Sequence, residues 1–121
     1  MIAEALIAAA LAPAYSGRTD EQRPLRLDLK EGRVTRVKGS VRAYECKTFG
    51  DVGPVRFDVR VRARVGRNGR FSFVTGDRSE RIGIAGRLHG TSATGRVRMA
   101  GTIATGRRCE SPAIKFRLRA R

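Results

Sequence analysis

The stretch from Pro54 to Val65 alternates apolar and polar residues almost without interruption. Every second position is Val, Phe or Ala, and arginine or aspartate falls between them. Successive side chains of a strand point to opposite faces of a sheet. This segment therefore predicts a β-strand with one apolar face and one arginine-rich face.

The same two-residue period recurs along most of the chain. Further strands are predicted over residues 15–19, 25–29, 33 to about 44, 71–75, 82–88, 93–104 and 114–118. A change of parity between Val34 and Val37 predicts a bulge, and residues 45–53 and 105–112 are predicted to be polar connections. Glycines inside the later strands predict strong curvature. The pattern indicates an all-β fold of about eight antiparallel strands in a meander, closed as a small barrel or folded as a two-layer sandwich.

The first 14 residues differ from the rest. Residues 2–14 are mainly Ala, Leu and Ile and end in Ala12-Pro13-Ala14, a pattern typical of the end of a secretory signal, although no basic residue precedes the apolar run. The alternative is a short helix of the mature protein. We expect residues 1–14 to be a signal-peptide remnant and residues 15–121 to form one β domain, secreted or held in the cell envelope. The run is too short to span a bilayer.

The chain has two cysteines, Cys46 and Cys109, each in a polar stretch beside a predicted strand. An even count in a chain with an export signal favours a disulfide. Two free thiols in a cytosolic protein, or metal ligands, are the competing interpretations. A metal or other cofactor is not expected, because two Cys and one His match no zinc spacing.

The charge balance is strongly basic. There are 26 Lys and Arg against 11 Asp and Glu, a formal net charge of +15, and 22 of the cations are Arg. The electrostatic field of so basic a protein attracts polyanions. Arginine codons are GC-rich, however, so part of the excess can reflect genomic base composition rather than function.

Three predicted strands place most of their cations on one face. If they are neighbours, their outward surface is a dense array of guanidinium groups, which bind phosphate, sulfate and carboxylate through paired hydrogen bonds. The predicted binding residues are Arg56, Arg60, Arg62, Arg64, Arg96, Arg98, Lys115, Arg117 and Arg119. The expected partner is an anionic polysaccharide, another cell-envelope polymer or, less favoured, nucleic acid. Alternatively, these charges only keep the protein soluble and its strand edges from aggregating.

An enzyme is not expected. The single histidine, His89, lies beside Gly90 at a predicted turn and has no obvious carboxylate partner. A binding protein, monomeric or weakly associating, fits the sequence better. If the barrel encloses a deep apolar cavity, a small-ligand carrier becomes the alternative.

Residues 70–75, Arg-Phe-Ser-Phe-Val-Thr, resemble the aromatic strand motif of cold-shock and related barrel domains. That resemblance implies that Phe71 and Phe73 stack on nucleic-acid bases. The competing interpretation is that both rings belong to the core.

A broader resemblance covers most of the chain after residue 14. It rests on Tyr15-Ser16-Gly17-Arg18-Thr19, on Gly32-Arg33-Val34 after the second strand, on Ala93-Thr94-Gly95, and on Cys109-Glu110-Ser111. In these motifs the chain is similar to a group of small, exported all-β proteins of high-GC bacteria. The resemblance implies the architecture, export and a bridge between the two cysteines, but no activity.

Overall fold

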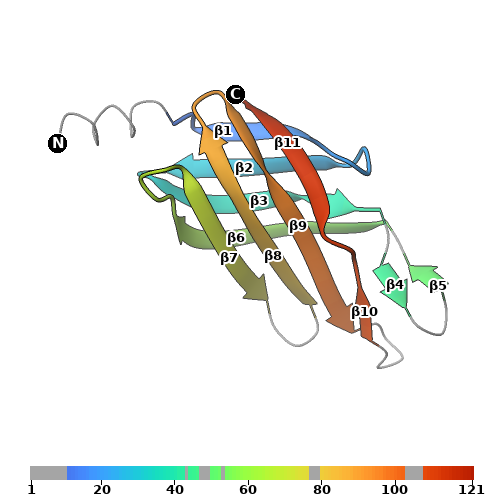
Figure 1. The fold of residues 1–121 in the computed structure, drawn as a ribbon. Coiled ribbons are helices and arrows are strands. Elements are labelled where there is room, and N and C mark those ends of the chain that lie inside the picture. The colour runs from blue at the N-terminus through green and yellow to red at the C-terminus, as the bar shows by residue number, and fades with distance from the viewer. Residues whose placement is uncertain (1–10, 43, 47–49, 53, 77–79, 103–107) are drawn as a thin grey trace, which may run out of the picture.

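Two layers of antiparallel strands cross each other (Figure 1). The buried apolar side chains of both layers form one core cluster. The computed structural model describes residues 11–42, 44–46, 50–52, 54–76, 80–102 and 108–121. The strands are β1 (Ala14–Thr19), β2 (Pro24–Lys30), β3 (Arg33–Val41), β4 (Tyr44–Cys46), β5 (Gly50–Val52), β6 (Val55–Arg64), β7 (Arg70–Gly76), β8 (Glu80–His89), β9 (Ser92–Thr102), β10 (Arg108–Glu110) and β11 (Ile114–Ala120). In this part of the chain no helix is long and apolar enough to cross a membrane.

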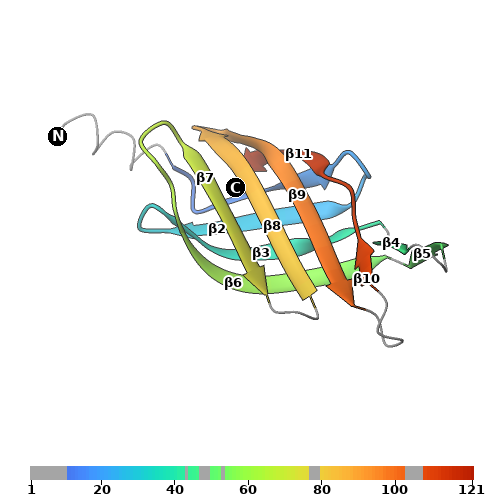
Figure 2. The same ribbon diagram turned by 60° about the horizontal axis from the view of Figure 1, so that its bottom comes forward.

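The eight long strands form a nearly closed barrel. They follow the order β6-β3-β2-β1-β11-β9-β8-β7, and the first and last strands of the chain, β1 and β11, pair with each other. No ladder joins β6 to β7 among the described residues, and these two strands diverge from their hairpin (Figure 2). The predicted all-β meander is therefore confirmed, with one open seam between β6 and β7.

The two predicted polar connections also contain strands. β4 and β5 lie within residues 45–53 apart from Tyr44, and β10 lies within residues 105–112. Each has only three residues, which is too short for a two-residue period to be recognised. They form because partners are available: β10 extends along β9, β4 pairs with β10, and β5 pairs with β4.

The predicted bulge in β3 is confirmed. The pairing of β3 with β6 shifts between Val34 and Arg36, and the pairing of β2 with β3 shifts between Asp28 and Leu29. The extra residue restores the parity, so Val34 and Val37 both point inward and are fully buried.

Alternate residues of every long strand supply the core. The side chains that are at most 1% exposed include Tyr15, Leu25, Leu27, Val34, Val37, Val41, Val97, Met99 and Leu118. The Tyr15 hydroxyl donates a hydrogen bond to the Gly90 carbonyl, so its one polar atom is satisfied. The core accounts for the regular two-residue period of the strands, because a one-residue shift in register would turn the apolar side chains of a strand towards solvent.

Residues 11–14 belong to the fold rather than lying outside it. The Leu29 amide donates to the Pro13 carbonyl (2.8 Å), and the Arg121 amide donates to the Ala14 carbonyl (2.9 Å). Residues 1–10, most of the predicted signal segment, lie outside the described residues. Cleavage after Ala14 would remove both of these contacts.

Two inward-facing glycines bring β8 and β9 close together. Gly86 lies directly opposite Gly95, and a Cβ on Gly95 would lie 2.3 Å from the Ala85 carbonyl oxygen and 2.7 Å from the Phe116 ring. A Cβ on Gly86 would likewise lie 3.1 Å from the Phe71 ring. Each ring therefore covers a glycine from inside the barrel, which allows the sharp curvature predicted from the sequence.

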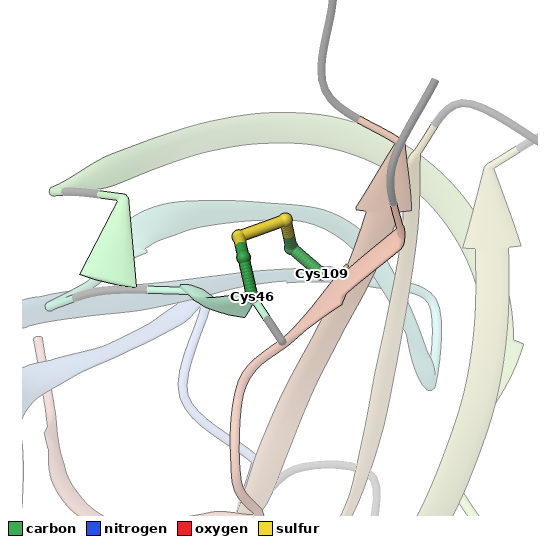
Figure 3. The surroundings of a disulfide bond; sticks show 2 residues. All are labelled: Cys46 and Cys109. Carbon is green, nitrogen blue, oxygen red and sulfur yellow. A yellow bond between two sulfur atoms is a disulfide. The ribbon is translucent and has the colours of Figure 1, made fainter. Parts of the chain in front are cut away.

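The disulfide between Cys46 and Cys109 is present (Figure 3). The two residues face each other on β4 and β10, with a Cα–Cα distance of 4.4 Å. Both side chains are buried. The bridge attaches the short β4–β5 hairpin to the end of the barrel, and the prediction of a disulfide is confirmed.

Candidate anion-binding channels

The structure brings part of the predicted basic surface together. β9 and β11 are neighbours, and Arg96 lies directly opposite Lys115. On the other side of β11, Arg117 lies opposite Arg18 of β1. All of these side chains point outward, because the residues next to them in sequence are buried in the core. The cationic strands β9 and β11 therefore form one continuous surface.

The four predicted arginines of β6 lie elsewhere in the sheet. Strands β1, β2 and β3 separate β6 from β11. The curl of the barrel nevertheless returns the end of β6 to β7 through a tight hairpin, in which Gly69 has a φ of 81° and its amide donates to the Gly66 carbonyl. Arg64 is thereby placed near β7 and β8, at the far end of β6 from Arg56.

A channel runs across the outer surface of β7, β8, β9 and β11. Its floor is the backbone of one cross-strand row of inward-facing residues, Phe71, Gly86, Gly95 and Phe116. Its walls are the two flanking rows of outward-facing residues. Two hollows, of about 970 and 550 Å³, occupy this space and share Thr94, Gly95 and Arg96. We call this hollow surface the β7–β11 channel.

Among the residues that the structure describes, six cations line the β7–β11 channel. They are Arg64, Arg70, Arg87, Arg96, Lys115 and Arg117. Among the described residues, Asp20, in the turn after β1, is the one carboxylate that lines it. Glu80, exposed at the start of β8, lies outside it. The channel is therefore strongly positive.

Two of these six residues were missed by sequence reasoning. Arg70 and Arg87 face each other across β7 and β8. Each is a single arginine in its part of a strand, so neither contributes to a local run of charge. The pairing of β7 with β8 in a hairpin would have predicted their contact. Arg87 is also held in place, since its Nε donates to the Asn68 carbonyl (2.8 Å).

A second channel crosses the outer surface of β1, β2, β3 and β6. Its floor is the row Gly17, Leu25, Gly39 and Phe57. The hollow measures about 780 Å³. Its charged lining consists of Arg18, Arg23, Arg26, Lys38, Arg56, Arg121 and one carboxylate, Asp58. We call it the β1–β6 channel. Of the predicted binding residues, only Arg56 lines it.

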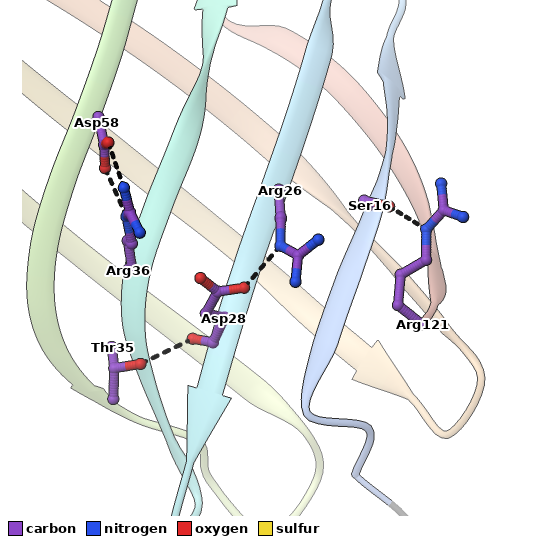
Figure 4. A network of polar contacts seen from close by, with 7 residues as sticks. All are labelled: Ser16, Arg26, Asp28, Thr35, Arg36, Asp58 and Arg121. Carbon is purple, nitrogen blue, oxygen red and sulfur yellow. Dashed lines mark hydrogen bonds and ion pairs between the residues drawn. The ribbon is translucent and has the colours of Figure 1, made fainter.

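Asp58 is already neutralised by an arginine. Arg36 binds both of its carboxylate oxygens, with Nε 2.7 Å from Oδ1 (Figure 4). These hydrogen bonds hold the pKa of Asp58 below its usual range and raise the pKa of Arg36. The carboxylate therefore stays ionised at neutral pH, and its charge is compensated from outside the channel lining.

The other predicted binding residues lie outside both channels. Arg60 and Arg62 lie on the middle of the outer face of β6, and Arg98 and Arg119 flank the β7–β11 channel without lining it. These four positions carry charge of the same kind as the channels. They provide matched controls for experiments that separate net charge from position.

The aromatic pair of β7 faces the interior. Phe71 is 4% exposed and Phe73 is half-buried, both on the same side of the strand as the core. Phe71 therefore belongs to the core, and Phe73 packs against the core. A small hollow of about 320 Å³ opens at the β6–β7 seam beside Phe57.

Groups suited to other chemistry are sparse in the described part of the chain. The Nε2 atom of the exposed His89 lies 3.2 Å from the Thr94 hydroxyl oxygen, Oγ1. No group of three His, Cys, Asp or Glu among the described residues could hold a metal ion.

The chain was also compared with known proteins. No family model matches it, and neither a curated protein nor a solved structure shows significant similarity. The channels are therefore the basis for any assignment of function.

Proposed function

We propose that this protein is a secreted binding module that holds an anionic polymer in the β7–β11 channel. The observation that supports this most directly is the lining of that channel by six cations on five strands, with one carboxylate at its edge. The disulfide accords with a secreted or envelope location, because such bonds persist in oxidising compartments.

The arrangement has a cost in the absence of a ligand. Like charges directly opposite each other on neighbouring strands destabilise a sheet. Within the lining of the β7–β11 channel, Arg96 faces Lys115 and Arg70 faces Arg87. An anion placed between the two walls would relieve this repulsion, so ligand binding and stability should be coupled.

The dimensions favour a polymer over a single anion. The channel crosses four strands, which are spaced about 4.8 Å apart, so it extends for roughly 14 Å. Several charged groups of a sulfated, phosphorylated or uronic polysaccharide fit along that length. Arginine forks on both walls can each hold one such group through paired hydrogen bonds.

Salt-dependent retention on immobilised heparin tests this proposal. The channel variant Arg96→Gln with Arg117→Gln and the control variant Arg60→Gln with Arg62→Gln each remove two charges from the same +15 chain. We expect the channel variant to elute at clearly lower salt than the control, because only its charges lie beside the bound polymer. Equal shifts for the two variants would mean that net charge alone retains the protein, and the proposal would be refuted.

A further inference from the structure

The β1–β6 channel contains three arginines that each donate a hydrogen bond to a neighbouring side chain. Arg26 donates from Nε to Asp28 (2.8 Å), Arg23 donates from Nε to the Ser40 hydroxyl (3.0 Å), and Arg121 donates from Nε to the Ser16 hydroxyl. In each case the bond uses Nε alone. Figure 4 shows the terminal nitrogens of Arg26 and Arg121 turned away from the residues that hold them.

This arrangement differs from an ordinary exposed arginine. A free arginine side chain loses much rotamer entropy when it binds an anion, whereas a guanidinium that is already held loses less. Ser40 is 3% exposed, so Arg23 is held by a buried hydroxyl rather than by a mobile surface group. The terminal nitrogens of Arg23 and Arg121 have no hydrogen bond among the described residues and retain their donors for a ligand.

Three further cations, Arg18, Lys38 and Arg56, complete the lining. The register places Ser16, Arg26, Lys38 and Asp58 along one wall. Arg18 and Arg56 lie on the other wall. In the described part of the chain the lining holds six cations and one carboxylate, and Arg36 already binds both oxygens of that carboxylate. The lining therefore keeps a net charge of +5, that is, six minus one.

We infer that the β1–β6 channel is a second anion site, which takes a tetrahedral oxyanion, the phosphate or sulfate group. Such a group offers several acceptor oxygens to donors that converge from different strands, and held guanidiniums bind it through pairs of hydrogen bonds. The hollow of about 780 Å³ also leaves room for the rest of a molecule that bears the phosphate or sulfate group. This inference does not depend on polymer binding in the β7–β11 channel.

The test exchanges arginine for lysine, which keeps the charge and removes the fork. Arg26→Lys with Arg121→Lys leaves the formal net charge at +15, and Arg60→Lys with Arg62→Lys is the matched control outside both channels. Inorganic phosphate and inorganic sulfate are titrated separately, and backbone amide shifts are followed by NMR. We expect the largest shifts at Gly17, Gly39 and Arg26. Affinity should fall roughly tenfold in the first variant and stay unchanged in the control.

The source of the group is distinguished by a second titration with a soluble sulfated polysaccharide. If only the polymer shifts the amides of this channel, the oxyanion belongs to a polymer; if the free ions do so too, a small solute suffices. Equal losses in both lysine variants, or no shifts at this channel with any of the three ligands, would overturn the inference. Retention of the Arg26→Lys with Arg121→Lys variant on heparin should be unchanged, so failure here is separable from failure of the proposed function.

Discussion

Removal of the disulfide is expected to lower the free energy of unfolding by about 4 kcal/mol. Cys46 and Cys109 are separated by 63 residues. In the chain-entropy model a bridge that closes a loop of this length restricts the unfolded chain by about 4 kcal/mol at 25 °C. Domains of this size have a total stability of about 5 to 15 kcal/mol. The bridge is therefore expected to supply a large share of the stability.

Urea unfolding of three proteins measures this contribution. These are the oxidised wild type, the wild type in reductant, and the double variant Cys46→Ala with Cys109→Ala. The reduced wild type keeps both side chains, so any further loss in the double variant reports their packing rather than the cross-link. We expect a loss of about 4 kcal/mol in the reduced wild type. Since β4 and β10 lie away from both channels, heparin retention of the folded protein should not change. A loss below about 1 kcal/mol on reduction would refute the entropic reasoning.

Three further predictions test the packing and the polar contacts. Gly95→Ala should destabilise the protein by about 1 to 3 kcal/mol in urea unfolding, because the new Cβ would lie 2.3 Å from the Ala85 carbonyl oxygen. Gly32→Ala is the control. Its new Cβ meets no atom within 4 Å, so this variant tests only the backbone φ of 74°. Ser111→Ala should cost about 1 to 3 kcal/mol by thermal unfolding, since the buried Ser111 hydroxyl accepts from the Met99 amide (2.8 Å) and the variant leaves that donor unpaired. Asp58→Asn should be less stable than the wild type at neutral pH. Because the pKa of Asp58 is lowered in the folded protein, the difference in stability between the two proteins should persist above the unfolded pKa of about 3.9 and disappear as the pH falls through the folded pKa. A difference in stability that does not depend on pH would contradict the role of Arg36.

The sequence predicts the long strands well because one face of each is buried. In β6, for example, Phe57 and Ala63 enter the core while Arg56 and Arg62 remain exposed. The two-residue period can therefore be recognised in the sequence without knowledge of the neighbouring strands. The bulge near Val34 was legible for the same reason. The short strands β4 and β10 were not, because three residues carry too little periodicity and depend on partners that are distant in sequence.

The channels were only partly predictable. Arg96, Lys115 and Arg117 come from strands that alternate clearly, and their meeting requires only that β9 and β11 be neighbours. The contribution of Arg64 depends on the closing curl of the barrel, which no local pattern encodes. Arg23 and Arg121 lie outside the long strands, and their fixed orientation depends on single hydroxyl groups.

Base composition offers an alternative origin for the arginines, and the positions of the acidic residues bear on that alternative. A preference for GC-rich codons can raise the number of arginines, but it does not dictate which strands lack Asp and Glu. Among the outward positions of the eight long strands, the acidic residues are Asp28 and Asp58, both in the β1, β2, β3 and β6 layer and both bound to arginines. In the β7, β8, β9 and β11 layer the one acidic residue is Glu80, which is exposed at the start of β8, lines the hollow at the β6–β7 seam and lies outside the β7–β11 channel. Like charges repel each other across that layer. The uneven distribution of acidic residues therefore favours an anion-binding surface over an arginine excess that reflects base composition alone.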